Sequence, residues 1–355
     1  MKTRNKILLL AVLAFGAAAF TAALFALSEK KARFQNRFIR KFPSHMAKLR
    51  NSRELPFNSY YFAGHGNGLI YLGNTTAPFV VTVLDSTLKT VSVAKINIEG
   101  SEQLMRFPSL RVNPPYFYFY EGSVPFVYSG NIMDWKAQYR KSEGAHFSQA
   151  QAVGSNSFVA RYTDPATAKN SIRIAEFHTS GPSIMSADLL AGTGGDVFDT
   201  DGTLIYDRTA GRVAYVFYYK NTFFTADRRL ADRIEGKTID TVSVPAVKTV
   251  SIEGRNQRTF AGKPLLVNRL AAADEGLMYV NSQLPGHFEP LEMWKNSSII
   301  DIYDPVAGAY LSSIYITDIE GRKPGSIVVD GNSLYALSGR QIVRYSINKK
   351  LVKNK

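Results

Sequence analysis

Hydrophobic residues occur in two different patterns along the chain. Residues 7–27 form one unbroken run, ILLLAVLAFGAAAFTAALFAL, with no charge and a single hydroxyl at Thr21. Because an α-helix rises about 1.5 Å per residue, this run spans roughly 30 Å, the thickness of a bilayer's hydrocarbon core. It predicts one transmembrane helix, with a cleaved signal peptide as the alternative. From about residue 58 the apolar runs become short and alternate with Gly, Asn, Asp and Pro, which indicates an all-β domain.

The segment between these two parts, residues 28–43, continues a helical pattern. Phe34, Phe38 and Phe42 are spaced four apart, so their rings would share one helix face, and Pro43 would end the helix. We expect a basic amphipathic helix that lies on anionic lipid, or alternatively a solvated stalk. The residues expected at the membrane surface are Arg33, Phe34, Arg37, Phe38, Arg40 and Lys41.

The positive charge of the chain is concentrated near its N-terminus. The formal net charge is +14, and residues 1–50 contain eleven Lys or Arg and one acid, Glu29, so they carry +10 and the remainder carries +4. The β domain is therefore close to neutral, and we expect no nucleic-acid partner. The absence of cysteine excludes disulfides and cysteine-based metal sites.

Two features of the sequence predict opposite orientations for the predicted anchor. Basic residues flank the apolar run on both sides, with more of them after it, so charge alone would place the domain inside the cell. An N-terminal anchor ahead of a large β domain favours the opposite orientation, with the domain outside the cytoplasmic membrane. We predict residues 1–27 as cytoplasmic tip and anchor, 28–57 as helix and linker, and 58–350 as an extracytoplasmic domain, periplasmic if the source is bacterial.

A turn followed by a short apolar strand recurs six times in the domain. The copies are NGLIY from Asn67, NPPYFY from Asn113, NSFVA from Asn156, DGTLIY from Asp201, EGLMY from Glu275 and NSLYA from Asn332. Their leading apolar residues are separated by 48, 41, 46, 73 and 57 positions, close to the length of a propeller blade of four strands, except for the long interval. We expect stacked blades, with a mixed sandwich as the alternative, and an insertion near residues 226–263 that is either a functional loop or a decorated edge.

The C-terminal phrases IIDIYDPVAGAYL and IVVDGNSLYALSGRQIVRYSI form two hairpins and a closing strand. They resemble six-bladed β-propellers of the NHL, YWTD and TolB-like grouping. The resemblance covers residues 58–350 by rhythm and is specific over the last 60 or so. It implies a six-bladed propeller behind one transmembrane helix and transfers no catalytic residue.

Candidate chemistry is sparse. Asp199 and Asp201 fit a calcium loop aligned on Gly202, but its first and last ligand positions fall on Val197 and Arg208, so we interpret this segment as a turn. No two histidines have zinc-ligand spacing, and no serine has a nucleophile-elbow context.

Two further features have alternative interpretations. We interpret His65 as an exposed turn residue, with a pore-facing position as the alternative. The aromatic runs at 116–120 and 215–219 predict strands packed on both faces, with an aromatic ligand platform as the alternative.

The sequence therefore predicts a binding or scaffolding module rather than an enzyme. Its expected partners are membrane lipid, through the N-terminal helix, and an unidentified protein or small molecule at the channel mouth or the insertion. No catalytic residue, metal ligand or cofactor is predicted. The alternative is a lactone or ester hydrolase with a metal in the axial channel, which requires acids, Asn or His from several blades to converge on the axis.

Overall fold

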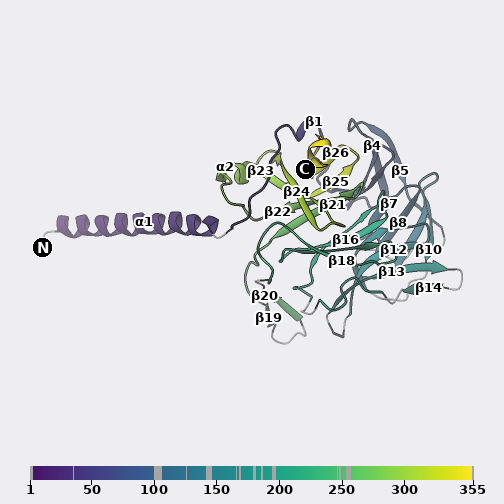
Figure 1. Ribbon diagram of the computed structural model, residues 1–355, viewed down its shortest axis with the longest axis horizontal. Helices are drawn as coiled ribbons and strands as arrows, with labels where there is room; N and C mark the ends of the chain where they lie inside the picture. Colours follow the sequence, from purple (N-terminus) through teal and green to yellow (C-terminus); the bar gives the residue numbers. More distant parts are fainter. Residues whose placement is uncertain are drawn as a thin grey trace.

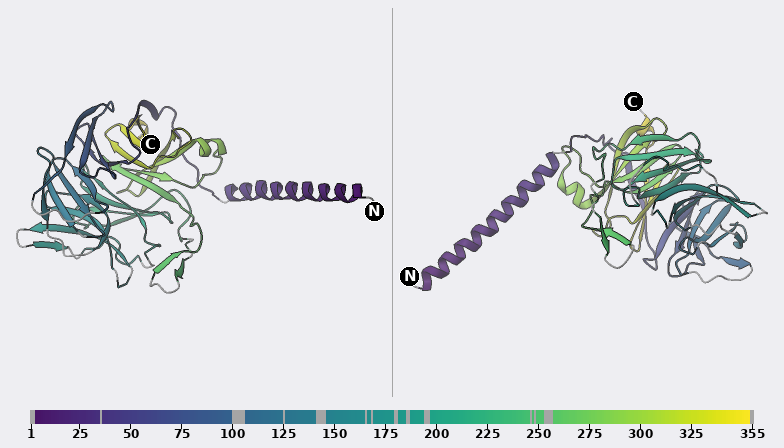
Figure 2. Two further views of the ribbon diagram at one scale, coloured as in Figure 1. Left: turned by 180° about the vertical axis from the view of Figure 1, so that it is seen from behind. Right: turned by 90° about the horizontal axis from the view of Figure 1, so that it is seen from below.

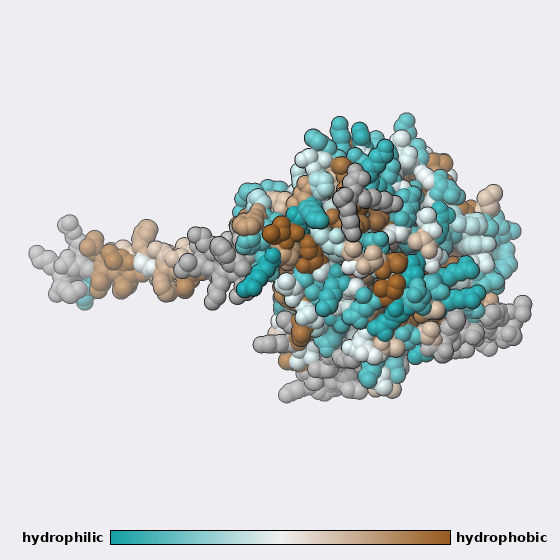
Figure 3. All heavy atoms as spheres, in the orientation of Figure 1, coloured by the Kyte–Doolittle hydropathy of each residue, from teal (hydrophilic) through white to brown (hydrophobic). Residues whose placement is uncertain are grey.

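One long helix precedes a β domain. The computed structural model describes residues 3–34, 36–99, 106–124, 126–140, 146–164, 166–167, 169–178, 181–184, 187–193, 197–245, 247, 249–252 and 257–353. Helix α1 (Thr3–Phe34) projects away from the domain (Figures 1 and 2). Its segment Leu8–Phe25 is long and apolar enough to cross a membrane, and none of it is buried against the rest of the chain. Figure 3 shows hydrophobic residues along this helix.

The strands form separate sheets around a common centre. A four-stranded sheet runs in the order β1 (Ala47–Glu54), β27 (Gln341–Ile347), β26 (Ser333–Ser338), β25 (Ser326–Asp330). A nine-stranded sheet runs in the order β5 (Thr90–Lys95), β4 (Val80–Asp85), β3 (Leu69–Asn74), β2 (Tyr60–Gly66), β7 (Ser109–Asn113), β8 (Tyr116–Glu121), β9 (Phe126–Asn131), β10 (Lys136–Arg140), β6 (Asn97–Glu99).

The remaining sheets each use strands that are consecutive in the chain. One contains β11 (Phe147–Ala152), β12 (Ser157–Thr163), β13 (Asn170–His178) and β14 (Gly181–Ile184). The next contains β15 (Gly202–Asp207), β16 (Arg212–Phe217), β17 (Thr222–Asp227) and β18 (Ile234–Lys237). Another contains β21 (Asn268–Asp274), β22 (Leu277–Ser282), β23 (Ser297–Asp304) and β24 (Ala309–Thr317). A separate hairpin pairs β19 (Thr249–Ile252) with β20 (Gln257–Phe260), and α2 (Leu291–Asn296) and α3 (Lys350–Lys353) are short.

The first strands of these groups form a ring. Strands β2, β7, β11, β15, β21 and β25 contact one another in this order, and β25 in turn contacts β2. Strand β2 pairs with β7 through Gly64 and Val112, where a Cβ on Gly64 would lie 2.0 Å from the Val112 carbonyl oxygen. Only glycine allows the two backbones to approach this closely. Sheets that radiate from such a ring give a β-propeller-like fold.

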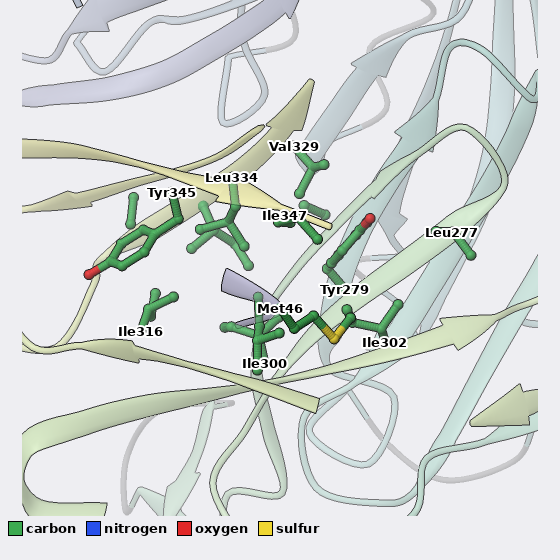
Figure 4. Packing of buried hydrophobic residues seen from close by; sticks show 14 of the residues in the cluster. Met46, Leu277, Tyr279, Ile300, Ile302, Ile316, Val329, Leu334, Tyr345 and Ile347 are labelled. Atoms are coloured by element: carbon green, nitrogen blue, oxygen red, sulfur yellow. The ribbon is translucent and has the colours of Figure 1, made fainter. Parts of the chain in front are cut away.

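Strand β1 joins the two ends of the domain in one sheet. It pairs antiparallel with β27, from Ala47 opposite Ile347 to Glu54 opposite Gln341. Met46, just before β1, packs beside Ile300 and Ile302 in a buried cluster that also contains Tyr345 (Figure 4). The domain therefore begins before residue 58, the predicted boundary, because a strand taken for linker completes the last sheet.

Aromatic strands pack on both faces, as the sequence predicts. In β8, Phe117 and Phe119 belong to one buried cluster, whereas Tyr118 and Tyr120 belong to another. Alternate side chains of a strand point to opposite faces of its sheet, so each face of β8 is covered by a different neighbour. The 116–120 run is core.

Two details of the predicted repeat are corrected. Five of the repeated turns connect a ring strand to the next strand of its sheet, but the copy at Asp201 opens the ring strand β15 itself. The equivalent turn lies between β15 and β16. The insertion also begins later than residue 226, because β17 and β18 complete their sheet as far as Lys237, and the β19–β20 hairpin lies outside that sheet. The outer strand of that sheet is β18.

Carboxylates at the ends of ring strands connect each sheet to the next. The buried side chain of Asp207, at the end of β15, accepts hydrogen bonds from the backbone N–H of Ala210 (2.9 Å) and of Gly276 in the following sheet (2.7 Å). Asp274, at the end of β21, accepts one from Gly331 in the sheet after that (2.7 Å). These contacts give part-buried turn N–H groups an acceptor.

We expect Asp207→Ala to lower the free energy of unfolding by about 1–3 kcal/mol, because it removes a buried carboxylate that accepts hydrogen bonds from N–H groups of two sheets. The control is Asp304→Ala, whose carboxylate accepts only from Val306 and Ala307 within its own hairpin. Urea unfolding of the detergent-solubilised full chain measures both. Equal losses for the two variants would show that the link between sheets adds nothing.

Candidate functional site

The ring strands enclose a cavity of about 240 Å³ on the domain axis. All of them contribute to its wall, and no Asp or Glu is among the lining residues that the structure describes. The polar lining residues are His65, Arg111, Asn113, Gln149, Gln151, Thr203, Tyr206, Arg208 and Ser326.

Most of these polar side chains bridge the edges of neighbouring sheets. Gln149 donates to the Gly202 carbonyl (2.7 Å) and accepts from the Leu204 N–H (2.9 Å). Gln151 and Asn113 likewise donate to main-chain carbonyls of the adjacent ring strand, each at 3.0 Å. Between neighbouring ring strands the described residues show backbone pairing only at Gly64 and Val112, so side chains supply the hydrogen bonds that a continuous ladder would make. Arg111 is also committed, since it donates to the carbonyls of Ala150 and Leu110.

Arg208 differs from these residues because it extends over the mouth of the cavity. It follows β15, yet its guanidinium lies against Gly66 at the end of β2, three positions away around the ring. A Cβ added to Gly66 would lie 3.0 Å from the Arg208 Cζ and Nη2 atoms. The missing side chain of Gly66 therefore provides the space in which Arg208 lies.

His65 lines the same cavity, half-buried, so the preferred interpretation of an exposed turn residue is wrong and the pore-facing alternative is confirmed. Its Nδ1 lies 3.4 Å from Asp330 Oδ1, at the end of β25. The pKa of Asp330 is lowered, mainly by this hydrogen bond, with further contributions from the positive charges of His65, Arg208 and Lys349, while burial opposes the change. The glycines on either side of His65 were the only signal in the sequence.

A larger hollow of about 650 Å³ adjoins the cavity and shares Asn113, Tyr206 and Arg208 with it. It adds Arg228, Arg229 and Glu176 to the wall, together with the β11–β12 turn. Burial raises the pKa of the Tyr206 phenol, and the positive charges of Arg228 and Arg208 oppose this rise. Both arginines are thus close enough to act on one hydroxyl, although neither has sequence features that mark it.

The acidic residues considered as metal ligands have other partners. Asp201 forms an ion pair with Arg161 and accepts from the Gly202 N–H, while Gly194 to Asp196 lie outside the described residues. Within the described part of the chain, no three His, Asp or Glu side chains are grouped as a metal site would require. The convergence that a metal-dependent hydrolase needs is not seen there.

No protein-family model and no curated protein matches the chain. Among solved structures, a member of the DUF4221 family from Bacteroides vulgatus is 11% identical, with a TM-score of 0.55 over 86% of this chain and 99% of that one. A catalytically inactive virginiamycin B lyase from Staphylococcus aureus, solved with quinupristin, is 12% identical, with a TM-score of 0.46 over 85% and 100%. BamB from Moraxella catarrhalis is 9% identical, with a TM-score of 0.38 over 85% and 98%.

The fold is β-propeller-like. The first of these structures supports it, and the other two have TM-scores too low to carry an argument. At such identities the likeness concerns fold alone, so function has to be argued from this chain's own site.

The residues predicted for a membrane-surface helix lie in different environments. Helix α1 ends at Phe34, so the helix predicted through residue 43 is contradicted over its second half. Arg33 and Phe34 belong to α1, but the placement of their side chains is not described; Arg37 and Lys41 are exposed. Phe38 and Arg40 are buried in the β domain instead of facing lipid. Lipid contact by the exposed pair stays a prediction.

Arg40 fixes the segment after α1 to the domain. Its guanidinium forms a two-bond ion pair with Asp301 (2.7 and 3.0 Å) and a second with Glu289 (2.7 Å). It also donates to Ser282 Oγ (2.7 Å) and the Leu284 carbonyl (3.1 Å), so all five of its N–H groups are used. Burial alone would lower the pKa of Arg40, but the two carboxylates outweigh it and raise the pKa. The spacing of the phenylalanines gave no sign of this role, because Asp301 is 261 positions away.

Neighbouring main-chain contacts extend the attachment. The His287 N–H donates to the Phe38 carbonyl and the Ser313 N–H to the Lys41 carbonyl, both at 2.8 Å. The Lys41 N–H donates to the Tyr310 hydroxyl at 2.9 Å. Residues 36–42 are thereby held along the sheet of β21–β24 as an extended segment, which explains why the helix stops.

We expect Arg40→Ala to lower the free energy of unfolding by about 3–5 kcal/mol, because it leaves two carboxylates buried without a counter-charge. Arg37→Ala, three residues earlier and exposed, is the control and should change it by less than about 0.5 kcal/mol. Urea unfolding followed by far-ultraviolet circular dichroism measures both. Similar stabilities of the two variants would show that the ion pairs do not hold the segment.

Proposed function

We propose that the chain is a membrane-anchored, six-bladed β-propeller whose axial channel binds a ligand on the extracytoplasmic side, periplasmic in a bacterium. The blades would be the strand groups β2–β5, β7–β10, β11–β14, β15–β18, β21–β24 and β25–β27, with β1 as the outer strand of the last. The ring of contacting strands β2, β7, β11, β15, β21 and β25 supports this count, and the pairing of β1 with β27 completes the last blade.

The observation that carries the binding role is the cavity that opens into the larger hollow at one end of the channel. Sites for small molecules are concave, have volumes of roughly 300–1,000 Å³ and place a few polar groups among apolar walls. The hollow falls in this range, and the shared residues Tyr206 and Arg208 connect it to the axis. A protein partner at the β19–β20 hairpin stays a separate prediction.

The membrane role rests on α1 and on its attachment to the domain. Only residue 35 separates the end of α1 from the segment that Arg40 holds, so the domain would stay close to the bilayer. Ile39 is 61% exposed and Phe288 is 83% exposed beside that segment, and Arg37 is exposed between them and the helix. Apolar side chains with basic neighbours suit a lipid headgroup region.

We expect the full chain to remain in the membrane pellet after carbonate extraction, because an uncleaved 21-residue apolar helix stays inserted. Protease added from the extracytoplasmic side should degrade the domain while the membrane is intact. The control places two charges in the span, Leu13→Glu with Phe15→Glu, and should be released. A mature N-terminus beyond Ala19 would contradict the anchor.

We expect Thr203→Trp to abolish binding, because an indole in the axial cavity occupies the space of the ligand. Mass spectrometry of small molecules that copurify with the detergent-solubilised chain measures the loss. Ser92→Trp, on the exposed face of β5, is the control and should retain them. If both variants fold and carry the same molecules in equal amounts, the axial channel is not the binding site.

A further inference from the structure

We propose that the channel mouth is an anion-binding site, in which Arg208 and Arg228 hold a carboxylate or phosphate group of a small organic molecule beside Tyr206. This inference rests on the proposed function and specifies the chemistry of its ligand. It is drawn from the mouth shared by the axial cavity and the adjoining hollow.

The first support is that the guanidinium groups at the mouth are uncommitted. Arg40, Arg161 and Arg212 elsewhere in the domain each form an ion pair with a carboxylate. In the part of the chain that the structure describes, no carboxylate lies within ion-pair distance of Arg208, Arg228 or Arg229. Their N–H donors are free to bind an incoming anion.

The acidic side chains near the same mouth already have hydrogen-bond or ion-pair partners. Asp207 and Asp274 are buried and accept hydrogen bonds from the turns of the next sheets. Asp330 faces His65, and Lys349 lies 2.9 Å from Glu275 and 3.7 Å from Asp274. Glu176 also lines the hollow. The nearby acids therefore reduce the positive electrostatic potential of the arginines. The N–H donors of the arginines stay available, and a carboxylate or phosphate binds through such donors.

The second support is position. Because Arg208 crosses the mouth to Gly66, a ligand that enters the cavity from this end has to pass its guanidinium. The planar fork of arginine matches two oxygens of a carboxylate or phosphate, and Arg228, in the β17–β18 turn, lines the same hollow as Tyr206 and Arg208. The volumes of the cavity and the hollow suit a small molecule rather than a macromolecule.

Isothermal titration of the detergent-solubilised full chain with citrate, with pyrophosphate and with uncharged sorbitol tests the site. We expect at least one anion to bind and sorbitol not to bind, and the two anions distinguish carboxylate from phosphate recognition. Arg208→Gln with Arg228→Gln should weaken binding by about tenfold or more, since charge-assisted hydrogen bonds are lost. The control, Arg50→Gln with Arg106→Gln, removes the same charge from exposed positions away from the hollow and should change binding by less than about twofold.

A second variant keeps the charge of the mouth unchanged. Gly66→Ala adds a methyl group 3.0 Å from the Arg208 Cζ and Nη2 atoms, so the guanidinium has to shift by a few tenths of an ångström and anion binding should weaken; at a φ of +152° the alanine also strains the backbone. Thermal unfolding confirms that each variant is folded. Equal weakening by both double variants, unchanged binding in the Arg208 and Arg228 variant, or no anion binding by the wild type would each overturn the proposal. If an uncharged molecule copurifies with the wild type and Thr203→Trp loses it, the channel binds a ligand but the anion site is refuted.

Discussion

Burial of both faces of every sheet is the constraint on which the structure depends. A four-stranded sheet leaves one face in water unless a neighbour covers it, and the aromatic strand β8 has side chains in two separate buried clusters. If such sheets were stacked in an open row, the outer faces of the first and last sheets, the two ends of the row, would still be exposed to water. The contact of β25 with β2 and the pairing of β1 with β27 remove those ends by closing the ring. Both termini of the domain are therefore required for one sheet.

Closure also determines what surrounds the axis. Ring strands that diverge cannot pair along their whole length, so Gln149, Gln151 and Asn113 bridge them through side chains, and Asp207 and Asp274 connect their ends to the following turns. These residues are used for architecture. Among the described residues, the arginines at the mouth form no ion pair with a carboxylate, so their N–H donors are the groups most available to a ligand.

The segment after α1 shows how the same residues can serve a different purpose from the one their pattern indicates. Phenylalanines four apart with basic neighbours are typical of a helix on lipid, yet Phe38 and Arg40 are interior residues of the domain. Desolvating a guanidinium is costly unless every donor is satisfied, and five hydrogen bonds with two carboxylates meet that condition. The segment that follows α1 is thus attached to the domain by an ion-pair cluster.

The sequence by itself determined the apolar span, the all-β class, the rhythm of the strands and the double-sided packing of the aromatic runs, since all of these depend on the spacing of neighbouring residues. Only the tertiary structure decided that residues 47–54 close the domain, that Arg40 meets Asp301, that His65 faces the axis and that Arg208 lies over Gly66. Each of these contacts joins residues far apart in the chain. These contacts exist because the sheets form a closed ring. The spacing of neighbouring residues in the sequence does not indicate which side chains a closed ring brings together.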